Sequence, residues 1–226
     1  MIEIRNLSKN YGKVKALDKI SINFEEGLVY GIIGSNGAGK TTLFECMAGL
    51  INYSGDISYP KTDMRIYTGF LPTVPDFLSL ITAREYLQLL CNARRIPNPN
   101  FRESNIFDLP LNRFISAYST GMKKKLAFTG ILMQKNELYL LDEPFNGVDL
   151  QSNIMLIEII RRLKQANKTV IISSHILSAL SEVCDRFILL KNGAVYRDVD
   201  KQAFHLIEKE LIQTEIRGRL SKLVIK

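Results

Sequence analysis

The sequence has few cysteines and no long hydrophobic run. Its three cysteines, Cys46, Cys91 and Cys184, lie far apart and form no CxxC pair. This spacing indicates neither a disulfide framework nor a zinc site, and it suits a reducing compartment such as the cytosol. No apolar stretch approaches the roughly 20 residues needed to span a bilayer, and the mixed-charge start MIEIRNLSKN does not resemble a secretory signal. We expect any work at a membrane to depend on a partner that anchors the chain.

The chain also lacks internal repeats and low-complexity segments. Its 226 residues are 46% hydrophobic and 23% charged, which is the composition of a folded protein with a sizeable core. The net charge of +7 and the pI of about 9.3 allow nucleic acid, a phosphate-rich ligand or an anionic membrane surface as the partner. Composition alone does not choose among these three.

Strands and helices alternate along most of the chain. Apolar residues occupy every second position in residues 2–4 and 20–24, which predicts half-buried antiparallel strands. Three later apolar runs predict strands buried on both faces, and a helical pattern follows each of them: GLVYGIIG, ELYLLDE and KTVIISSH. This alternation predicts an α/β fold with a mostly parallel core sheet.

A glycine-rich segment between the first buried strand and its helix carries the strongest functional signal. GSNGAGKTT fits the pattern G-x-x-x-x-G-K-[ST] and comprises Gly34, Ser35, Asn36, Gly37, Ala38, Gly39, Lys40, Thr41 and Thr42. Glycines let backbone N–H groups curl around one anion, and the helix start adds its positive end. In this pattern we expect Lys40 to reach the β- and γ-phosphates of a nucleotide and Thr41 to bind Mg²⁺.

Two acidic residues end the second buried strand. Adjacent carboxylates such as Asp142 and Glu143 are costly to bury unless a cation balances them. We expect Asp142 to bind Mg²⁺ through water and Glu143 to polarise an attacking water. His175 lies at the tip of the third buried strand, where it is placed to sense a γ-phosphate or to serve as a structural histidine.

The order of these motifs resembles the nucleotide-binding subunit of an ATP-binding-cassette transporter. The phosphate loop, the segment STGM, the run LLDEP, a nearby aspartate and the segment SSH follow one another within about residues 2–197. The S-x-G-M form and the NGVD segment are most similar to subunits that drive export-type permeases. The resemblance implies an ATPase that uses ATP and Mg²⁺, forms a homodimer or heterodimer of cassettes, and powers a separately encoded integral membrane permease. It also implies a cytoplasmic chain, peripheral on the inner face of the cell membrane.

The resemblance implies roles for individual residues. Tyr11 is similar to the aromatic residue that stacks on adenine, and Asp149 to the acid that communicates across the dimer. Asp142 and Glu143 match the metal-linked acid and the catalytic base, and His175 matches the γ-phosphate switch.

The segment YSTGM matches the family signature, which binds the γ-phosphate of ATP held by the opposite subunit. Ser119 offers a hydroxyl, and Gly121 permits close backbone approach. Thr120 and Met122 stand where glycine and glutamine are commoner. Thr73 replaces the usual metal-linked glutamine and is a weak metal candidate, since it is shorter and would reach the ion only through a water.

The family pattern implies a single cassette domain over residues 1–226. Residues 1–75 and 134–200 are expected to form a P-loop NTPase core with an N-terminal antiparallel β subdomain. Residues 76–133 are expected to form a small helical subdomain with the signature, in which the capping-box spacing of Thr82 and Glu85 predicts a helix over 82–95.

The last segment, residues 201–226, is expected to be a helix followed by a basic tail. Phe204, Ile207 and Leu211 would share one helix face. The basic end contains Arg217, Arg219, Lys222 and Lys226. This end is suited either to an anionic membrane leaflet or to solvent.

Three consecutive lysines, Lys123 to Lys125, follow the signature. On a helix they point in widely different directions, so we expect a solvated basic face. Nucleic acid is not expected, because no basic face with interleaved aromatics is present. The rival within the superfamily is a non-transport cassette acting on nucleic acid or ribosomes, which usually fuses two cassettes or inserts a coiled coil. A P-loop kinase is a second rival, but it gives no reason for STGM or SSH.

Overall fold

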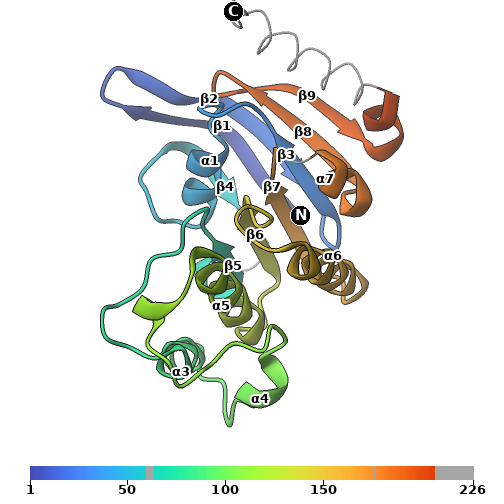
Figure 1. Ribbon diagram of the computed structural model, residues 1–226. Helices are drawn as coiled ribbons and strands as arrows, with labels where there is room; N and C mark the ends of the chain where they lie inside the picture. The colour runs from blue at the N-terminus through green and yellow to red at the C-terminus, as the bar shows by residue number, and fades with distance from the viewer. Residues whose placement is uncertain (60–63, 176, 207–226) are drawn as a thin grey trace, which may run out of the picture.

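A six-stranded sheet forms the centre of the protein, described by a computed structural model for residues 1–59, 64–175 and 177–206 (Figure 1). Its strand order is β5 (Thr68–Leu71), β6 (Leu138–Asp142), β7 (Thr169–Ser173), β3 (Val29–Ile33), β8 (Arg186–Lys191) and β9 (Ala194–Asp200). Neighbouring strands run parallel from β5 to β8, and β9 pairs antiparallel with β8. The predicted α/β fold with a mostly parallel core sheet is confirmed.

A second sheet contains the N-terminal strands β1 (Ile2–Tyr11) and β2 (Val14–Phe24), with β4 (Ser54–Ser58) on the other side of β1. All of its pairings are antiparallel. The predicted N-terminal antiparallel β subdomain is therefore confirmed. The sequence pattern did not indicate β4 or β5, because both strands are short and β4 carries mostly exposed residues.

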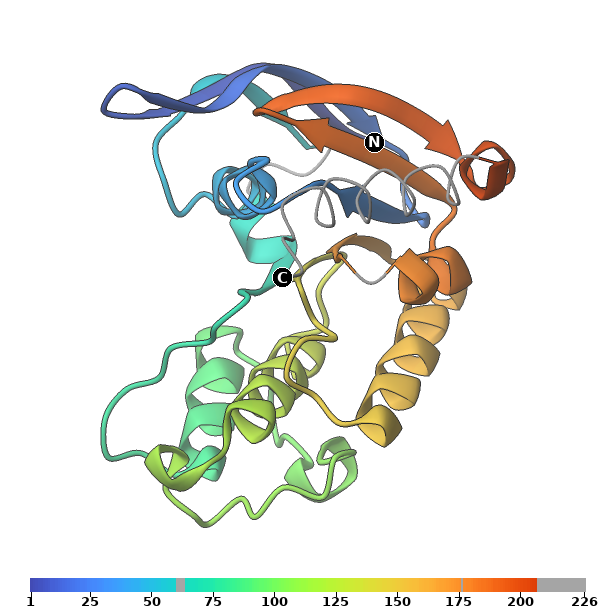
Figure 2. The ribbon, with the colours of Figure 1, turned by 45° about the horizontal axis from the view of Figure 1, so that its top comes forward.

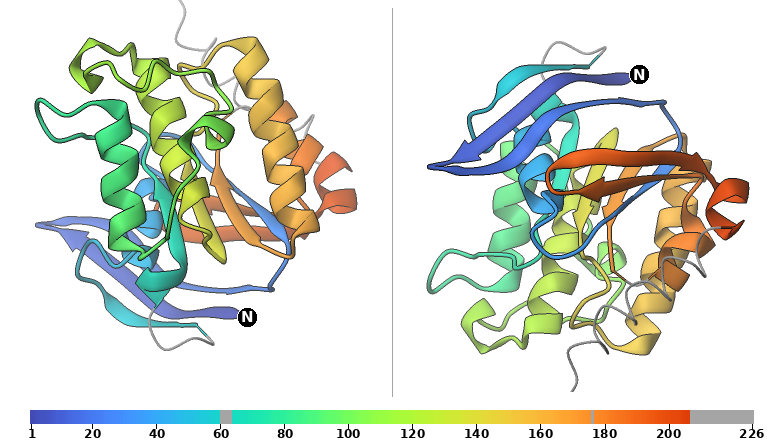
Figure 3. Two further views of the ribbon diagram at one scale, coloured as in Figure 1. Left: turned by 90° about the horizontal axis from the view of Figure 1, so that it is seen from below. Right: turned by 90° about the horizontal axis from the view of Figure 1, so that it is seen from above.

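Both faces of the central sheet are buried, which explains its nearly continuous apolar runs. Alternate residues of β3 face different clusters: Tyr30 and Ile32 belong to one core, and Val29 to the other. The first core also takes residues from the N-terminal sheet and from α1 (Lys40–Met47). The second core takes residues from the helices on the opposite face: α5 (Thr120–Met133), α6 (Leu150–Gln165) and α7 (Leu177–Val183) (Figure 3).

The segment between β5 and β6 is largely helical and has a hydrophobic cluster of its own, which includes Leu87 and Leu126. Figure 2 shows its green helices grouped away from the blue N-terminal strands. Besides α5 it contains α3 (Ala83–Ala93), α4 (Phe101–Ser104) and the 3-10 helix η1 (Ile115–Ala117), and the short α2 (Met64–Tyr67) precedes β5. The subdomain boundaries at 76 and 133 stay a prediction.

The predicted capping box begins α3. The Thr82 hydroxyl accepts a hydrogen bond from the Glu85 N–H at 3.2 Å, and the Glu85 carboxylate accepts one from the Thr82 N–H at 2.7 Å. The helix ends at Ala93, two residues before the predicted end, because Arg95 adopts a positive φ of 52° and the proline-rich segment IPNPN follows.

The described chain ends beside the central sheet. Residues 201–206 are helical, and Phe204 is buried and stacks on Phe187 with 3.8 Å between ring centroids. Predictions for the rest of the tail lie outside the described residues, namely those for Ile207, Leu211, Arg217, Arg219, Lys222 and Lys226. Among the residues that the structure describes, no helix is long and apolar enough to span a membrane.

Candidate functional site

The phosphate loop, the two acids, His175 and Thr73 gather where four neighbouring parallel strands end. The phosphate loop follows β3, Asp142 and Glu143 follow from β6, His175 lies just after β7, and Thr73 lies just after β5. Because β5, β6, β7 and β3 are adjacent in the sheet, their carboxyl ends meet along one edge. Ligands of open α/β sheets bind at this kind of edge.

The phosphate loop encloses its own lysine. Lys40 is 7% exposed, and its Nζ donates to the carbonyl oxygens of Gly34 at 2.8 Å and Ser35 at 3.4 Å. The same Nζ lies 3.9 Å from a carboxylate oxygen of Glu143. The ammonium is thus positioned between the loop and the predicted catalytic acid, within reach of a phosphate group in the loop.

Gly39 shows why this loop needs glycine. It precedes α1 with a φ of +105°, and a Cβ there would lie 2.6 Å from the carbonyl oxygen of Ala16. Both the backbone conformation and the contact exclude a side chain. Because Gly39 has no side chain, the N–H groups in the first turn of α1 are accessible to an anion.

Asp142 is fully buried and accepts hydrogen bonds from three hydroxyl groups. Thr41 donates to its Oδ2 at 2.7 Å, Thr73 donates to the same oxygen at 2.6 Å, and Ser173 donates to Oδ1. Hydroxyl and carboxylate oxygens are the ligands that Mg²⁺ prefers, so this donor set fits the predicted ion. No cluster of three or more His, Cys, Asp or Glu side chains suited to a metal occurs within the described parts of the chain.

Two contacts of this cluster were not predicted from the sequence. Thr73 was expected to reach the ion only through a water, which stays a prediction, but its hydroxyl donates to the same Asp142 oxygen as that of Thr41. Ser173 was not predicted at all. The structure explains the contact, since Ser173 pairs with Asp142 in neighbouring strands at the same level of the sheet.

Glu143 is 7% exposed, and its carboxylate contacts residues on both sides. The Oε2 atom lies 2.9 Å from Nδ1 of His175 and accepts from the Asn146 side-chain amide at 3.3 Å. His175 remains about half exposed, with 53% of its side chain accessible. The structure thus brings the predicted base and the predicted γ-phosphate switch into direct contact.

The signature segment lies at the start of α5. The hydroxyl of Ser119 accepts from the Met122 N–H at 3.2 Å and caps the helix, and Ser119 and Thr120 are both exposed. A Cβ on Gly121 would lie only 2.7 Å from the carbonyl oxygen of Gly147. Packing within this chain therefore requires glycine at position 121, because any side chain there would keep α5 away from the loop after β6.

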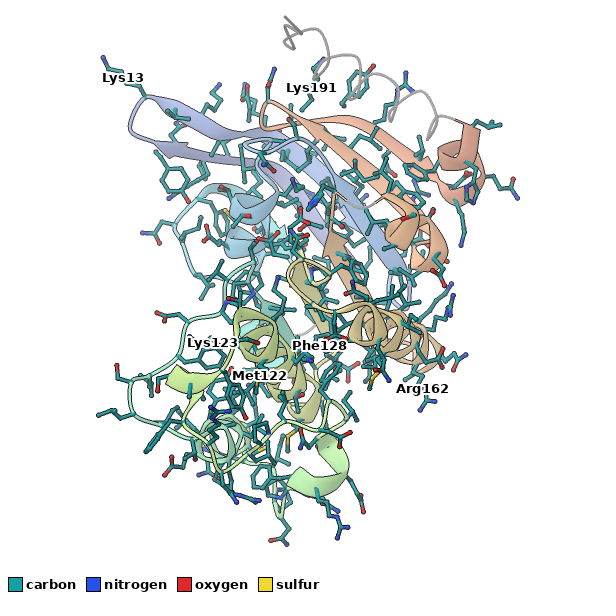
Figure 4. The ribbon with its side chains drawn as sticks, in the orientation of Figure 1. Lys13, Met122, Lys123, Phe128, Arg162 and Lys191 are labelled. Atoms are coloured by element: carbon teal, nitrogen blue, oxygen red, sulfur yellow. The ribbon has the colours of Figure 1, made fainter. Side chains whose placement is uncertain are left out.

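The three lysines after the signature do not form one solvated face, so that prediction was wrong for Lys124. Lys124 is 3% exposed, whereas Lys123, labelled in Figure 4, is partly exposed. Lys125 forms an ion pair with Asp149 at 3.1 Å. The helix rotates the three side chains in different directions, and one of these directions points into the protein.

Asp149 lies at the N-terminus of α6. Its carboxylate accepts from the Ser152 N–H at 2.8 Å and from the Ser152 hydroxyl at 2.8 Å. These hydrogen bonds, followed by those from Lys125, hold the pKa of Asp149 well below its usual value. The predicted dimer-contact acid thus links the start of α6 to Lys125 of α5.

Tyr11 lies at the end of β1, next to the turn that carries Lys13 in Figure 4. Its ring is 48% exposed, and the Lys9 Nζ lies 5.1 Å from the ring centroid. The Tyr11 hydroxyl donates to Glu45 at 3.4 Å, which places the ring beside α1. An exposed aromatic ring next to the phosphate loop helix is suited to stacking on a base.

A model of the family described as ABC transporter matches residues 17–146, more than half of the chain. The chain belongs to the ATP-binding-cassette family. It is an ATP-binding subunit of an ABC transporter, and its activity class is ATPase. This agrees with the prediction made from the order of the motifs.

Relatives along the full length support the assignment. The chain is 32% identical over 209 residues to the uncharacterized ABC transporter ATP-binding protein YybJ of Bacillus subtilis, covering 85% of this chain and 94% of YybJ. It is 29% identical over 241 residues to the bacitracin transport ATP-binding protein BcrA of Enterococcus faecalis, covering 100% of this chain and 78% of BcrA.

Solved cassettes share the fold. A structure of the ATP binding subunit of an ABC transporter superposes with a TM-score of 0.80 at 25% identity, covering 98% of this chain and 100% of that one. A dimeric post-hydrolysis structure of the cassette MJ0796, bound to ADP and Pi, gives a TM-score of 0.79 at 21% identity, covering 89% and 99%. The latter likeness is one of fold.

Proposed function

We propose that this chain hydrolyses ATP between two cassettes and thereby drives a separately encoded membrane permease of the export type. The observation that carries the proposal is the convergence of Lys40, Asp142, Glu143 and His175 at one sheet edge, while Ser119 lies exposed at the start of α5. The sheet edge would bind the phosphates, and the exposed segment is available to a neighbouring subunit.

Each residue of the proposed site has a physical role. Lys40 and the N–H groups of the phosphate loop bind the β- and γ-phosphates. Thr41 would ligate Mg²⁺ and Asp142 would bind it through water, with Thr73 orienting the Asp142 carboxylate. A bound Mg²⁺ would supply positive charge against the phosphates. Glu143 accepts a proton from the attacking water. His175, which contacts Glu143, senses the γ-phosphate. Tyr11 stacks on adenine.

The signature residues complete the neighbour's site in this proposal. Ser119 and Gly121 approach the γ-phosphate of ATP bound to the partner, with the positive end of α5 directed at it. ATP binding closes the dimer, and hydrolysis reopens it. Asp149 lies at the start of α6, next to Lys125 of α5, and is available for contact across the dimer.

An exposed apolar segment supports a membrane-protein partner. Between Thr73 and α3, three large side chains point to solvent: Val74 is 74% exposed, Leu78 is 64% exposed and Leu80 is 80% exposed. Apolar side chains gathered in one short segment are typical of a docking surface. The segment begins at Thr73, which contacts Asp142, so the permease would contact a loop that touches the nucleotide site. A chain bound this way lies in the cytoplasm, peripheral on the inner membrane face.

The test is whether blocking hydrolysis captures the closed dimer. We expect Glu143→Gln to keep ATP binding, lose turnover and elute as a dimer with ATP and Mg²⁺ in size-exclusion chromatography. Glu158→Gln, on the exposed face of α6, is the matched control and should behave like the wild type. A Glu143→Gln protein that binds ATP yet remains monomeric would contradict the composite site.

A second measurement addresses the permease. Affinity purification of the full chain from native membranes should recover a multi-span membrane protein, and replacing Leu78 and Leu80 by serine should release it without changing ATP turnover of the isolated chain. Recovery that is unchanged by these substitutions would place the partner elsewhere.

A further inference from the structure

The second lysine after the signature, Lys124, is buried inside the protein. It belongs to the first turns of α5, the helix whose N-cap is Ser119. Its side chain is 3% exposed, although burying an ammonium group is costly unless hydrogen bonds compensate. The burial of Lys124 therefore cannot be explained by a solvated helix face, and the explanation must lie in its hydrogen-bond partners.

The Lys124 ammonium contacts the loop that follows β6. Its Nζ donates to the carbonyl oxygen of Glu143 at 2.8 Å and to that of Asn146 at 2.9 Å. Burial lowers the pKa of Lys124, and the nearby carboxylates of Glu143 and Asp142 oppose that shift. The lysine therefore bridges two backbone carbonyls of one short loop from a different helix.

The backbone of Glu143 is held from both sides. Its φ is +51°, in the left-handed region that non-glycine residues seldom adopt. Its N–H donates to the carbonyl oxygen of Ser173 at 3.1 Å and to the Ser173 hydroxyl at 3.0 Å, while its carbonyl accepts from Lys124. These bonds fix the peptide groups on either side of Glu143, and so fix the direction in which its carboxylate leaves the backbone toward His175.

We propose that Lys124 is a positioning residue: it holds the Glu143 backbone so that the carboxylate faces the attacking water, and it ties that carboxylate to the signature helix. Lys124 and Ser119 share α5, so a displacement of the signature segment by a neighbour's ATP reaches Glu143 through Lys124. The proposal rests on the proposed function, because it assumes that Glu143 is the base.

Two substitutions of Lys124 separate hydrogen bonding from packing. Lys124→Met keeps most of the volume but removes the donors, and Lys124→Gln retains a donor group. We expect Lys124→Met to lower kcat about tenfold or more, since small displacements of a catalytic group are costly, while KM for ATP stays within about twofold. Lys124→Gln should recover kcat to within about threefold of the wild type.

Matched measurements decide between positioning and general destabilisation. Lys135→Met, an exposed lysine beyond the other end of α5, should leave kcat unchanged. The positioning role is wrong if Lys124→Met lowers kcat and ATP affinity together. It is also wrong if Lys124→Gln melts at the wild-type temperature but does not recover kcat. Unchanged kcat in Lys124→Met would also overturn it.

A double substitution distinguishes failure of this proposal from failure of the proposed function. If Lys124 acts through Glu143, adding Lys124→Met to Glu143→Gln should change the residual turnover less than twofold. A further tenfold loss would show that Lys124 acts elsewhere. Normal hydrolysis by Glu143→Gln alone would instead refute the proposed role of Glu143, whatever the result for Lys124.

Discussion

The two regions with a proposed role in ATP binding, the sheet edge and the start of α5, differ in how many contacts they make within the chain. At the sheet edge, Lys40, Asp142 and Glu143 are buried and hydrogen bonded to neighbours within the chain. At the start of α5, Ser119 and Thr120 are exposed, and the Ser119 hydroxyl caps its own helix. The first region is held together by contacts within the chain, whereas the second gains its proposed role only against another subunit. Substitutions in the two regions should therefore fail in different ways.

The largest expected effect is on the assembled region. Lys40→Ala removes an ammonium group enclosed by the phosphate loop, and charged hydrogen bonds contribute about 1.5–3 kcal/mol each, so ATP affinity should fall by roughly a hundredfold. Equilibrium binding of a fluorescent ATP analogue measures this. Lys13→Ala, at the exposed β1–β2 turn, is the control of equal charge. Tight binding by Lys40→Ala would remove the phosphate loop from the proposed site.

A smaller effect is expected in the exposed region. Gly121→Ala places a Cβ 2.7 Å from the Gly147 carbonyl oxygen, so the start of α5 must move away from the loop after β6. We expect turnover at saturating ATP to fall about tenfold, while ATP affinity of the isolated chain changes less than about twofold. If Gly121→Ala weakened ATP binding as strongly as Lys40→Ala, the two regions would not be separable.

The smallest effect is expected at Thr73, which lies between the site and the exposed apolar segment. Thr73→Gln replaces the hydroxyl bonded to Asp142 at 2.6 Å by a longer donor, so ATPase activity of the isolated chain should stay within about threefold. Transport-coupled activity with the permease in liposomes should change more than this. Thr73→Val, which lacks the hydroxyl, reports on the Asp142 contact alone. No change in either assay would make this position unimportant for coupling.

Local patterns were sufficient to predict the sheet edge. The apolar runs before Gly34, Asp142 and His175 gave three buried strands, and parallel strands place their following residues side by side. The family and the ATPase class also followed from the order of the motifs. The individual roles of Tyr11, Ser119, Gly121, Asp149 and the other site residues stay predictions.

The remaining contacts could not be predicted, because tertiary packing creates them. A lysine between two other lysines gives no sign of burial in the sequence. Only the approach of α5 to the loop after β6 determines which of Lys123, Lys124 and Lys125 is enclosed. The reach of Thr73 likewise depends on where β5 ends relative to Asp142. Since β5 has four residues and no alternating pattern, its position was not available from the sequence.

The contact between Gly121 and Gly147 has a mechanical consequence. Neither residue has a side chain, so the backbone of α5 lies directly against the backbone of the loop after β6. The start of α5 is thereby joined to the loop from Glu143 to Asp149 by this backbone contact, by the hydrogen bonds of Lys124 and by the ion pair of Lys125. We expect the start of α5 and this loop to move together.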